Sequence, residues 1–181
     1  MENKHQAKSG KYGLFFGMIG TSMVLMYFLT YLNSFQIFGH AWFSETRLFM
    51  TLLMGSVMAI IMLGFMHKMY QNKVINIAII AGAIILFTTA LFLVRSQRTV
   101  TGLDYMEAMI PHHSIAILTS DRAQIKDLRV RKLADEIILA QRREIKEMEW
   151  LIADIRENGF ATTETEADQR PVPDFEGSLN Q

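Results

Sequence analysis

The sequence contains no cysteine, which excludes disulfide bonds and metal sites built on thiolates. It also has no excess of charge of either sign, with 18 basic and 18 acidic residues. A neutral chain of this kind gives no basis for nucleic-acid binding. Charged residues are entirely missing from three long stretches, residues 12–44, 48–66 and 74–94. Soluble core helices rarely stay apolar on every face for so long.

These stretches predict a membrane domain over residues 12–98. A helix needs about 20 apolar residues to cross a bilayer, and the expected spans are 12–32, 48–66 and 74–94. The first is expected to be retained, because it is longer than the apolar part of a signal peptide and no A-x-A-like cleavage site follows it. Residues 1–11 then form a short N-terminal tail.

The basic residues predict the orientation. The lysines on one side of the predicted membrane domain outnumber the arginines on the other side. Basic residues gather on the cytoplasmic side of membrane proteins, so the lysine side is expected to be cytoplasmic. The expected cytoplasmic set is Lys4, Lys8, Lys11, Lys68 and Lys73, and the opposite set is Arg47, Arg95 and Arg98. We therefore expect a multi-pass protein of the plasma (inner) membrane. Its N-terminus would be cytoplasmic and its C-terminal domain extracytoplasmic, or periplasmic.

Residues 99–158 have frequent charges and periodic apolar positions, which predict two helices over about 104–122 and 128–157. Asp104 and Asp127 are suited to begin these helices, and Gly159 to end the second. Pro111 is expected to kink the first helix or to restart it.

The tail 159–181 is acidic, rich in Thr and aperiodic, which predicts disorder.

The second polar helix has apolar residues at alternating spacings of three and four, which is typical of a bundle helix. Two helices cannot enclose a core of their own. We therefore expect a homodimer through residues 104–157, in which two hairpins form one four-helix bundle. The predicted fold class is all-α: three transmembrane helices followed by an extracytoplasmic two-helix hairpin, half of a ferritin-like bundle.

Soft metal-ligand types gather on both polar helices. Met109, His112 and His113 are neighbours at spacings of three and four, with Met106 one turn earlier. Gln141, Glu144 and Met148 form a similar cluster on the second helix, where Gln141 and Glu144 could be supporting polar residues. Thioether and imidazole without thiolate suit Cu(I) or Ag(I) better than zinc or magnesium. The alternative is structural: methionines that fill gaps in the core and histidines that make hydrogen bonds.

The segment 104–155 resembles a known family. It reads D-Y-M-E-A-M-I-P-H-H-S-I-A-I, followed by L-A-D-E-I-I-L-A-Q-R-R-E-I-K-E-M. This closely resembles the "domain of unknown function 305" family, whose hallmarks are M-I-P-H-H-x-x-A-I and L-A-x-x-I-I-x-x-Q-x-x-E-I-x-x-M. The resemblance implies a ferritin-like helical bundle. It also implies copper binding, as in some periplasmic members that bind copper through Met and His and support copper resistance.

Carried over to this sequence, the resemblance implies a metal site of Met109, His112, His113 and Met148, with Met106 as a further candidate. Two departures from the family pattern are visible. Many members have a methionine shortly after the histidine pair, within A-I-x-M, whereas this chain has Leu118 and Thr119 after A-I. Many members also carry two copies of the pattern, whereas this chain carries one, which fits the expected dimer.

Signals for catalysis are missing. Glu-x-x-His, the motif of a di-iron bundle, occurs only at Glu2–His5 in the N-terminal tail and is missing from the two polar helices. The sequence also has no H-E-x-x-H and no glycine-rich phosphate loop, so we expect no enzyme. A second methionine series, Met50, Met54, Met58, Met62 and Met66, recurs every four residues in the second span. Each step rotates by about 40° relative to the last, so lipid contact and helix packing explain this series better than a metal path.

Two functional hypotheses follow. The first is a membrane-anchored, extracytoplasmic metal-binding protein for Cu(I) or Ag(I), acting in sequestration or copper tolerance; its partners would be membrane lipid, the metal ion and a second copy. The second is a structural module that dimerises or docks a partner without any metal.

Overall fold

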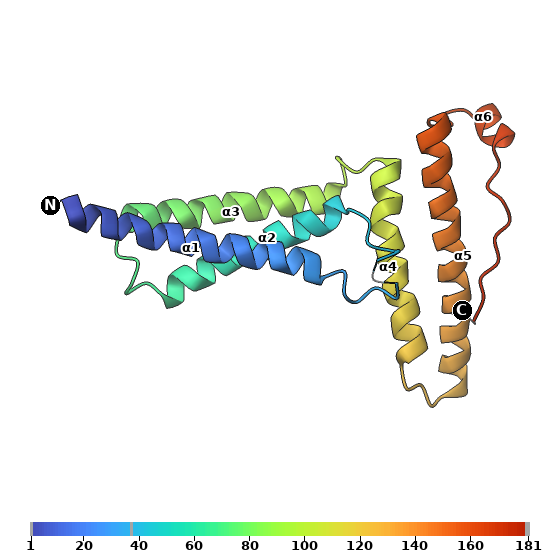
Figure 1. Cartoon of the computed structure of the whole chain (residues 1–181), viewed down its shortest axis with the longest axis horizontal. Coiled ribbons are helices and arrows are strands. Elements are labelled where there is room, and N and C mark those ends of the chain that lie inside the picture. Colours follow the sequence, from blue (N-terminus) through green and yellow to red (C-terminus); the bar gives the residue numbers. More distant parts are fainter. Residues whose placement is uncertain (1, 37, 180–181) are drawn as a thin grey trace. The chain divides into compact units, whose positions relative to one another are not determined.

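The structure, a computed structural model, describes residues 2–36 and 38–179, with side chains from residue 11 onward. It is all-helical over these residues, as the sequence predicts (Figure 1). The helices are α1 (Glu2–Leu29), α2 (Glu45–Phe65), α3 (Lys73–Ser96), α4 (Gly102–Arg122), α5 (Leu128–Asn158) and α6 (Glu164–Gln169).

The chain divides into two compact units. Unit 1 contains α1, α2 and α3, and unit 2 contains α4, α5, α6 and the loop Tyr31–Ser44. The sequence assigned this loop, hereafter the α1–α2 loop, to the membrane domain 12–98. In the structure it packs instead with the polar helices.

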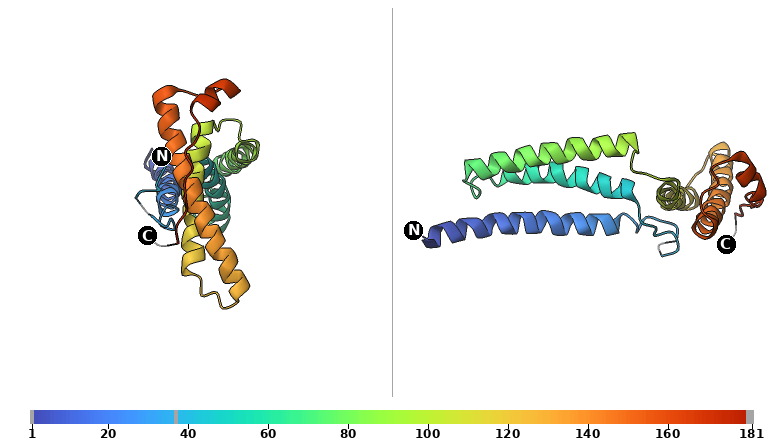
Figure 2. Two further views of the ribbon diagram at one scale, coloured as in Figure 1. Left: turned by 90° about the vertical axis from the view of Figure 1, so that its right-hand side faces the viewer. Right: turned by 90° about the horizontal axis from the view of Figure 1, so that it is seen from above.

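Unit 1 has three helices long and apolar enough to cross a membrane: Lys11–Leu29, Glu45–Phe65 and Lys73–Ser96. They agree with the predicted spans 12–32, 48–66 and 74–94 to within a few residues. The three helices run alongside one another (Figures 1 and 2), and α2 contacts both α1 and α3. Many apolar side chains on their outer faces are exposed, which suits a lipid environment.

Close packing between α1 and α2 depends on a glycine. A Cβ at Gly55 would collide with the Met23 side chain, so the missing side chain makes room for this thioether. Within α2 the methionine series does not share one environment. Met50 and Met54 are exposed, whereas Met62 and Met66 pack against the core of unit 1. This agrees with helix packing and lipid contact rather than a metal path.

Helix α4 differs from its prediction at two points. Its N-cap is Thr101, not Asp104: the two residues form a capping box, in which each side chain binds the other's backbone N–H. The helix also continues through Pro111 without the restart that we considered. Helix α5 has the predicted caps, Asp127 at its start and Gly159, with φ 78°, at its end.

Helices α4 and α5 pack together around a buried apolar cluster. Its members are Met106, Ile110, Ile117, Ile138, Ile145, Met148 and Ile152. Phe35 and Trp42 of the α1–α2 loop pack against the same cluster. The guanidinium groups of Arg142 and Arg156 lie over these two rings, each 5.4 Å from a ring centroid. The loop therefore covers part of the apolar stripe that the sequence assigned to a second copy.

The C-terminal tail has more structure than the predicted disorder. It contains the short helix α6, which starts with a capping box between Thr163 and Glu166. Further on, Arg142 donates a hydrogen bond to the carbonyl of Ser178, and Lys146 to that of Glu176. Gly177 approaches α5 so closely that a Cβ there would collide with a backbone carbonyl.

Candidate functional site

The predicted metal residues fall into different environments. Met106 and Met148 are buried in the core of unit 2, and Met109 is half-buried against it. The structure therefore brings the three thioethers of the prediction into one cluster. Because this cluster is otherwise made of isoleucines, packing alone is enough to explain why these side chains are buried.

The register between α4 and α5 is set by two charge contacts. His113 Nδ1 lies 3.1 Å from Glu144 Oε2, and an Arg156 nitrogen lies 2.7 Å from Glu107 Oε1. The two helices therefore run in opposite directions. Met109 is one turn before His113, and Met148 is one turn after Glu144. In an antiparallel pair these two methionines lie at the same level, next to the His113–Glu144 contact.

His113 is the histidine of the pair that belongs to this interface. Its side chain is 14 % exposed, and its Nδ1 is buried without a well-formed hydrogen bond. The Nδ1 lies 3.1 Å from Glu144 Oε2 without hydrogen-bond geometry, and this contact becomes an ion pair only when the imidazole is protonated. Burial lowers the pKa of His113, although the nearby Glu144 carboxylate acts in the opposite direction. Its imidazole is therefore neutral near pH 7, which is the form that binds metals.

His112 and Gln141 are less involved. His112 is exposed, and its ring centroid lies 6.0 Å from that of His113. Gln141 is half-buried on α5. Over residues 11–36 and 38–179, whose side chains the structure describes, no group of three or more His, Asp and Glu side chains is placed to hold a metal.

Sequence reasoning missed His40, a buried histidine outside the predicted pair His112 and His113. His40 lies in the α1–α2 loop and is 7 % exposed, with its Nδ1 2.8 Å from the Oγ of Ser114 on α4. The same Oγ accepts a hydrogen bond from the Phe35 backbone N–H at 2.7 Å. Burial lowers the pKa of His40. No local pattern predicts this contact, since the partners are 74 and 79 residues apart in sequence.

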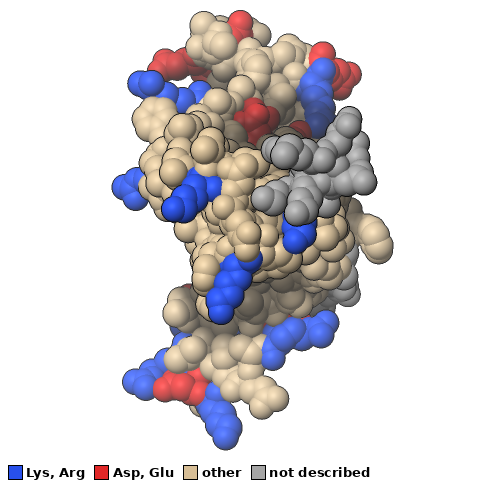
Figure 3. Space-filling model, turned by 90° about the vertical axis from the view of Figure 1, so that its left-hand side faces the viewer, with Lys and Arg blue, Asp and Glu red and all other residues tan. Residues whose placement is uncertain are grey.

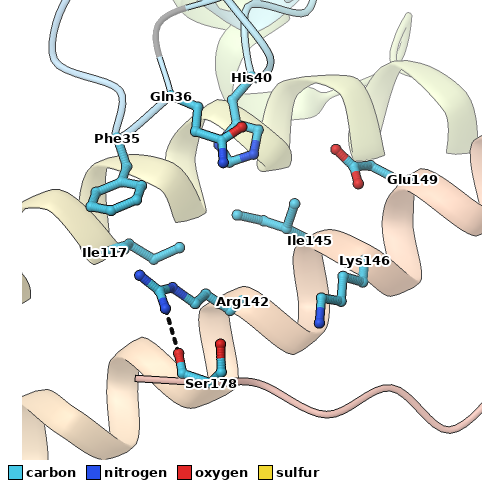
Figure 4. A pocket seen from close by; sticks show the side chains of 9 residues that line it. All are labelled: Phe35, Gln36, His40, Ile117, Arg142, Ile145, Lys146, Glu149 and Ser178. Carbon is cyan, nitrogen blue, oxygen red and sulfur yellow. Dashed lines mark hydrogen bonds between the residues drawn. The ribbon is translucent and has the colours of Figure 1, made fainter. Parts of the chain in front are cut away.

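A cavity of about 290 Å³ lies beside His40 (Figure 4). Its lining includes none of the predicted metal residues. It is formed by Phe35, Gln36, His40, Ile117, Arg142, Ile145, Lys146, Glu149 and Ser178. Figure 4 shows the C-terminal tail passing along one side, where Arg142 reaches the Ser178 carbonyl. Backbone carbonyls of the tail thus accept hydrogen bonds from the cationic side chains that line this cavity.

Comparisons with known proteins cover part of the chain. An uncharacterized protein of Acanthamoeba polyphaga mimivirus is 41 % identical over 59 residues, which is 32 % of this chain and 39 % of that protein. The chain therefore spans well under half of this relative. No solved structure matches. The family described as "Domain of unknown function (DUF305)" matches residues 102–177. The segment that contains α4, α5, α6 and the tail thus shows the resemblance to this family that its M-I-P-H-H motif predicts.

Proposed function

We propose that this protein anchors a DUF305-like helical domain to a membrane and that this domain binds a soft monovalent metal ion, Cu(I) or Ag(I). One observation carries the proposal: Met109 and Met148 lie at one level of the α4–α5 interface, beside a buried His113 Nδ1 that lacks a well-formed hydrogen bond. Two thioethers and a neutral imidazole are the donors that such an ion prefers.

The residues present fit this ion better than a harder one. The nearby carboxylate of Glu144 lies against the same Nδ1 of His113, so it would offset the positive charge of a bound ion rather than complete an oxygen cage. Met106, one turn from Met109, could supply a third sulfur, and the exposed His112 is available at the rim. Nothing in this set resembles a catalytic acid and base, so sequestration or metal tolerance is the role that we infer.

Metal titration tests the proposal. The purified full-length protein should bind Cu(I) and Ag(I) in competition with a chromophoric chelator, and the His112→Ala/His113→Ala double variant should bind more weakly. His67→Ala is the matched control, because His67 is exposed in the α2–α3 loop of unit 1. Equal affinity of the wild type and the double variant would remove both histidines from the site.

The proposed location is the plasma (inner) membrane, with unit 2 outside the cytoplasm. The α1–α2 loop packs with α4 and α5, and a three-span chain places that loop and the C-terminal domain on the same side. The packing therefore supports three crossings, while the lysine distribution argues for the direction. A periplasmically active reporter fused after residue 181 should be active, and activity of a cytoplasmic reporter alone would reverse the orientation.

We also propose that unit 2 forms a homodimer. The loop covers part of the apolar stripe, but Leu128, Val130 and Leu133 at the start of α5 remain exposed. A second copy of α5 would cover them and complete a four-helix bundle. Crosslinking of the full-length protein in detergent should give dimers that Leu133→Lys weakens, while Lys132→Gln, beside it on the polar face, does not. A monomeric wild type at micromolar concentration would contradict the dimer.

The rival function is a structural or partner-docking module. It is favoured by the His113–Glu144 contact and by the complete packing of Met106 and Met148 in an aliphatic core, which need no metal to explain them. The two functions differ in one result. If the protein is only a structural module, the wild type binds Cu(I) no more tightly than a variant in which both core methionines are replaced by leucine.

A further inference from the structure

A small cavity lies at one end of unit 1. At this end the apolar part of α1 begins and a loop connects α2 to α3. Its volume is about 110 Å³, and it is lined by Lys11, Tyr12, Lys68, Met69, Gln71 and Asn72. Lys11 is the first residue of the first candidate span, and the other side chains come from Tyr12 and from the connection between the second and third spans. The cavity therefore lies at the edge of the apolar part of the bundle, where headgroups meet a protein.

Hydrogen bonds and ring packing hold the residues around this cavity in place. The Tyr12 hydroxyl accepts a hydrogen bond from the Asn72 backbone N–H at 3.1 Å and donates one to the Asn76 Oδ1 at 2.8 Å. Asn76 in turn donates to the Tyr70 carbonyl at 2.7 Å. Tyr12 also packs against the Tyr70 ring, with the centroids 5.1 Å apart. These contacts join the start of α1 to the α2–α3 loop and hold the two lysine-bearing segments beside each other.

No carboxylate in the described part of the chain compensates the charge of this cavity. No Asp or Glu occurs in residues 3–44 or 46–103, and neither Lys11 nor Lys68 forms an ion pair within the described part of the chain. Figure 3 views the molecule from this side, with Lys and Arg standing out on a largely uncharged surface. Two ammonium groups beside one cavity attract an anion, which must come from outside the chain.

We propose that this cavity binds the phosphate group of an anionic membrane phospholipid. Phosphate oxygens can accept hydrogen bonds from both ammonium groups and from the Gln71 or Asn72 amide. The exposed Met69 side chain offers an apolar contact to the glycerol end of the lipid. Basic pockets between transmembrane helices bind such headgroups, and lysines near the membrane surface attract anionic lipids.

Lipid retention by the full-length protein tests this site. The protein is exchanged into phosphatidylcholine nanodiscs with and without phosphatidylglycerol, released into gentle detergent, and examined by native mass spectrometry. We expect retained phosphatidylglycerol on the wild type and a loss of about tenfold or more in its apparent affinity for Lys11→Gln/Lys68→Gln. The matched control, Arg95→Gln/Arg98→Gln, removes the same charge at the far end of α3 and should retain the lipid.

Each other outcome overturns the proposal. If the lysine double variant retains phosphatidylglycerol as well as the wild type does, the lysines merely lie in the headgroup region without a site. If both double variants lose it equally, general charge and not this cavity holds the lipid. If inorganic phosphate saturates the cavity in phosphatidylcholine nanodiscs and displaces phosphatidylglycerol, the ligand is free phosphate. Unchanged elution and thermal unfolding of the variants establish that they are folded.

Discussion

The Oγ of Ser114 on α4 lies 2.8 Å from the Nδ1 of His40 in the α1–α2 loop. Because the same Oγ accepts the Phe35 N–H, its own proton is free to be donated to a neutral imidazole. Ser114 is fully buried, so one hydroxyl joins the loop to the polar helices by two hydrogen bonds. Unit 2 is therefore formed from segments far apart in sequence.

Removing this hydroxyl should loosen the loop. Ser114→Ala leaves the Phe35 N–H and the His40 imidazole without their partner, and unsatisfied buried groups cost about 1–3 kcal/mol each. We expect a lower unfolding temperature for the full-length protein in detergent and faster proteolysis of the loop. Ser120→Ala, in the last turn of α4, is the matched control. An unchanged proteolysis pattern for Ser114→Ala would show that apolar packing alone holds the loop.

Acid should weaken the same attachment. Burial lowers the pKa of His40 below its ordinary value of 6.5, so the unfolded state binds the proton more readily than the folded one. Stability is therefore fully present above about pH 6.5 and declines as the pH falls towards the folded-state pKa. His113 has a lowered pKa as well and adds to the decline. Glu149, whose pKa is raised, acts with the opposite sign at more acidic pH.

Thermal unfolding from about pH 7.5 to pH 6 measures this effect. The wild type should lose stability over this range, and His40→Gln should reduce the slope without removing it, because His113 remains. Gln36→Ala, in the same loop, should keep the wild-type slope. A His40→Gln protein with an unaltered slope would contradict the role that we assign to this imidazole.

Metal binding should depend on sulfur more than on the shape of the core. Met148→Leu conserves volume, so it should cost less than about 1.5 kcal/mol of stability. If Met148 is a ligand, Cu(I) and Ag(I) should bind about tenfold or more weakly, since even outer-shell changes cost that much at metal sites. Met62→Leu, in the core of unit 1, is the control. Unchanged affinity in Met148→Leu would leave this methionine a packing residue.

The tail depends on a glycine. A Cβ at position 177 would collide with the Leu139 carbonyl, so Gly177→Ala should displace the tail from α5 and free Arg142 and Lys146 from its carbonyls. Limited proteolysis should then cut the C-terminal segment faster, with little change in unfolding temperature. Gly102→Ala is a suitable control because its added Cβ would meet a neighbour only at 3.8 Å. Equal cleavage rates would show that the tail is held elsewhere.

The features predicted well from sequence are those with a local cause. Three uncharged runs predicted the candidate spans. Asp127 and Gly159 predicted the ends of α5, because capping residues act within one turn of the helix end. The start of α4 was misplaced since Thr101 and Asp104 share the cap as a box. The docking of Phe35 and His40 had no signal, because one sequence shows no pattern across the 74 or 79 residues that separate them from Ser114.

The α1–α2 loop also imposes an order on biosynthesis. The loop leaves the ribosome before α2 and α3, yet its partner Ser114 is encoded 79 residues after Phe35. At the usual elongation rate of about 5–20 residues per second, the loop waits about 4–16 s for that partner. During that time Phe35 and Trp42 have no core to join. In the membrane-anchored arrangement proposed above, aromatic side chains such as these would favour the headgroup region of the bilayer. Assembly of unit 2 then requires all three candidate spans to have been synthesised first, so the loop can pack against α4 only late in translation.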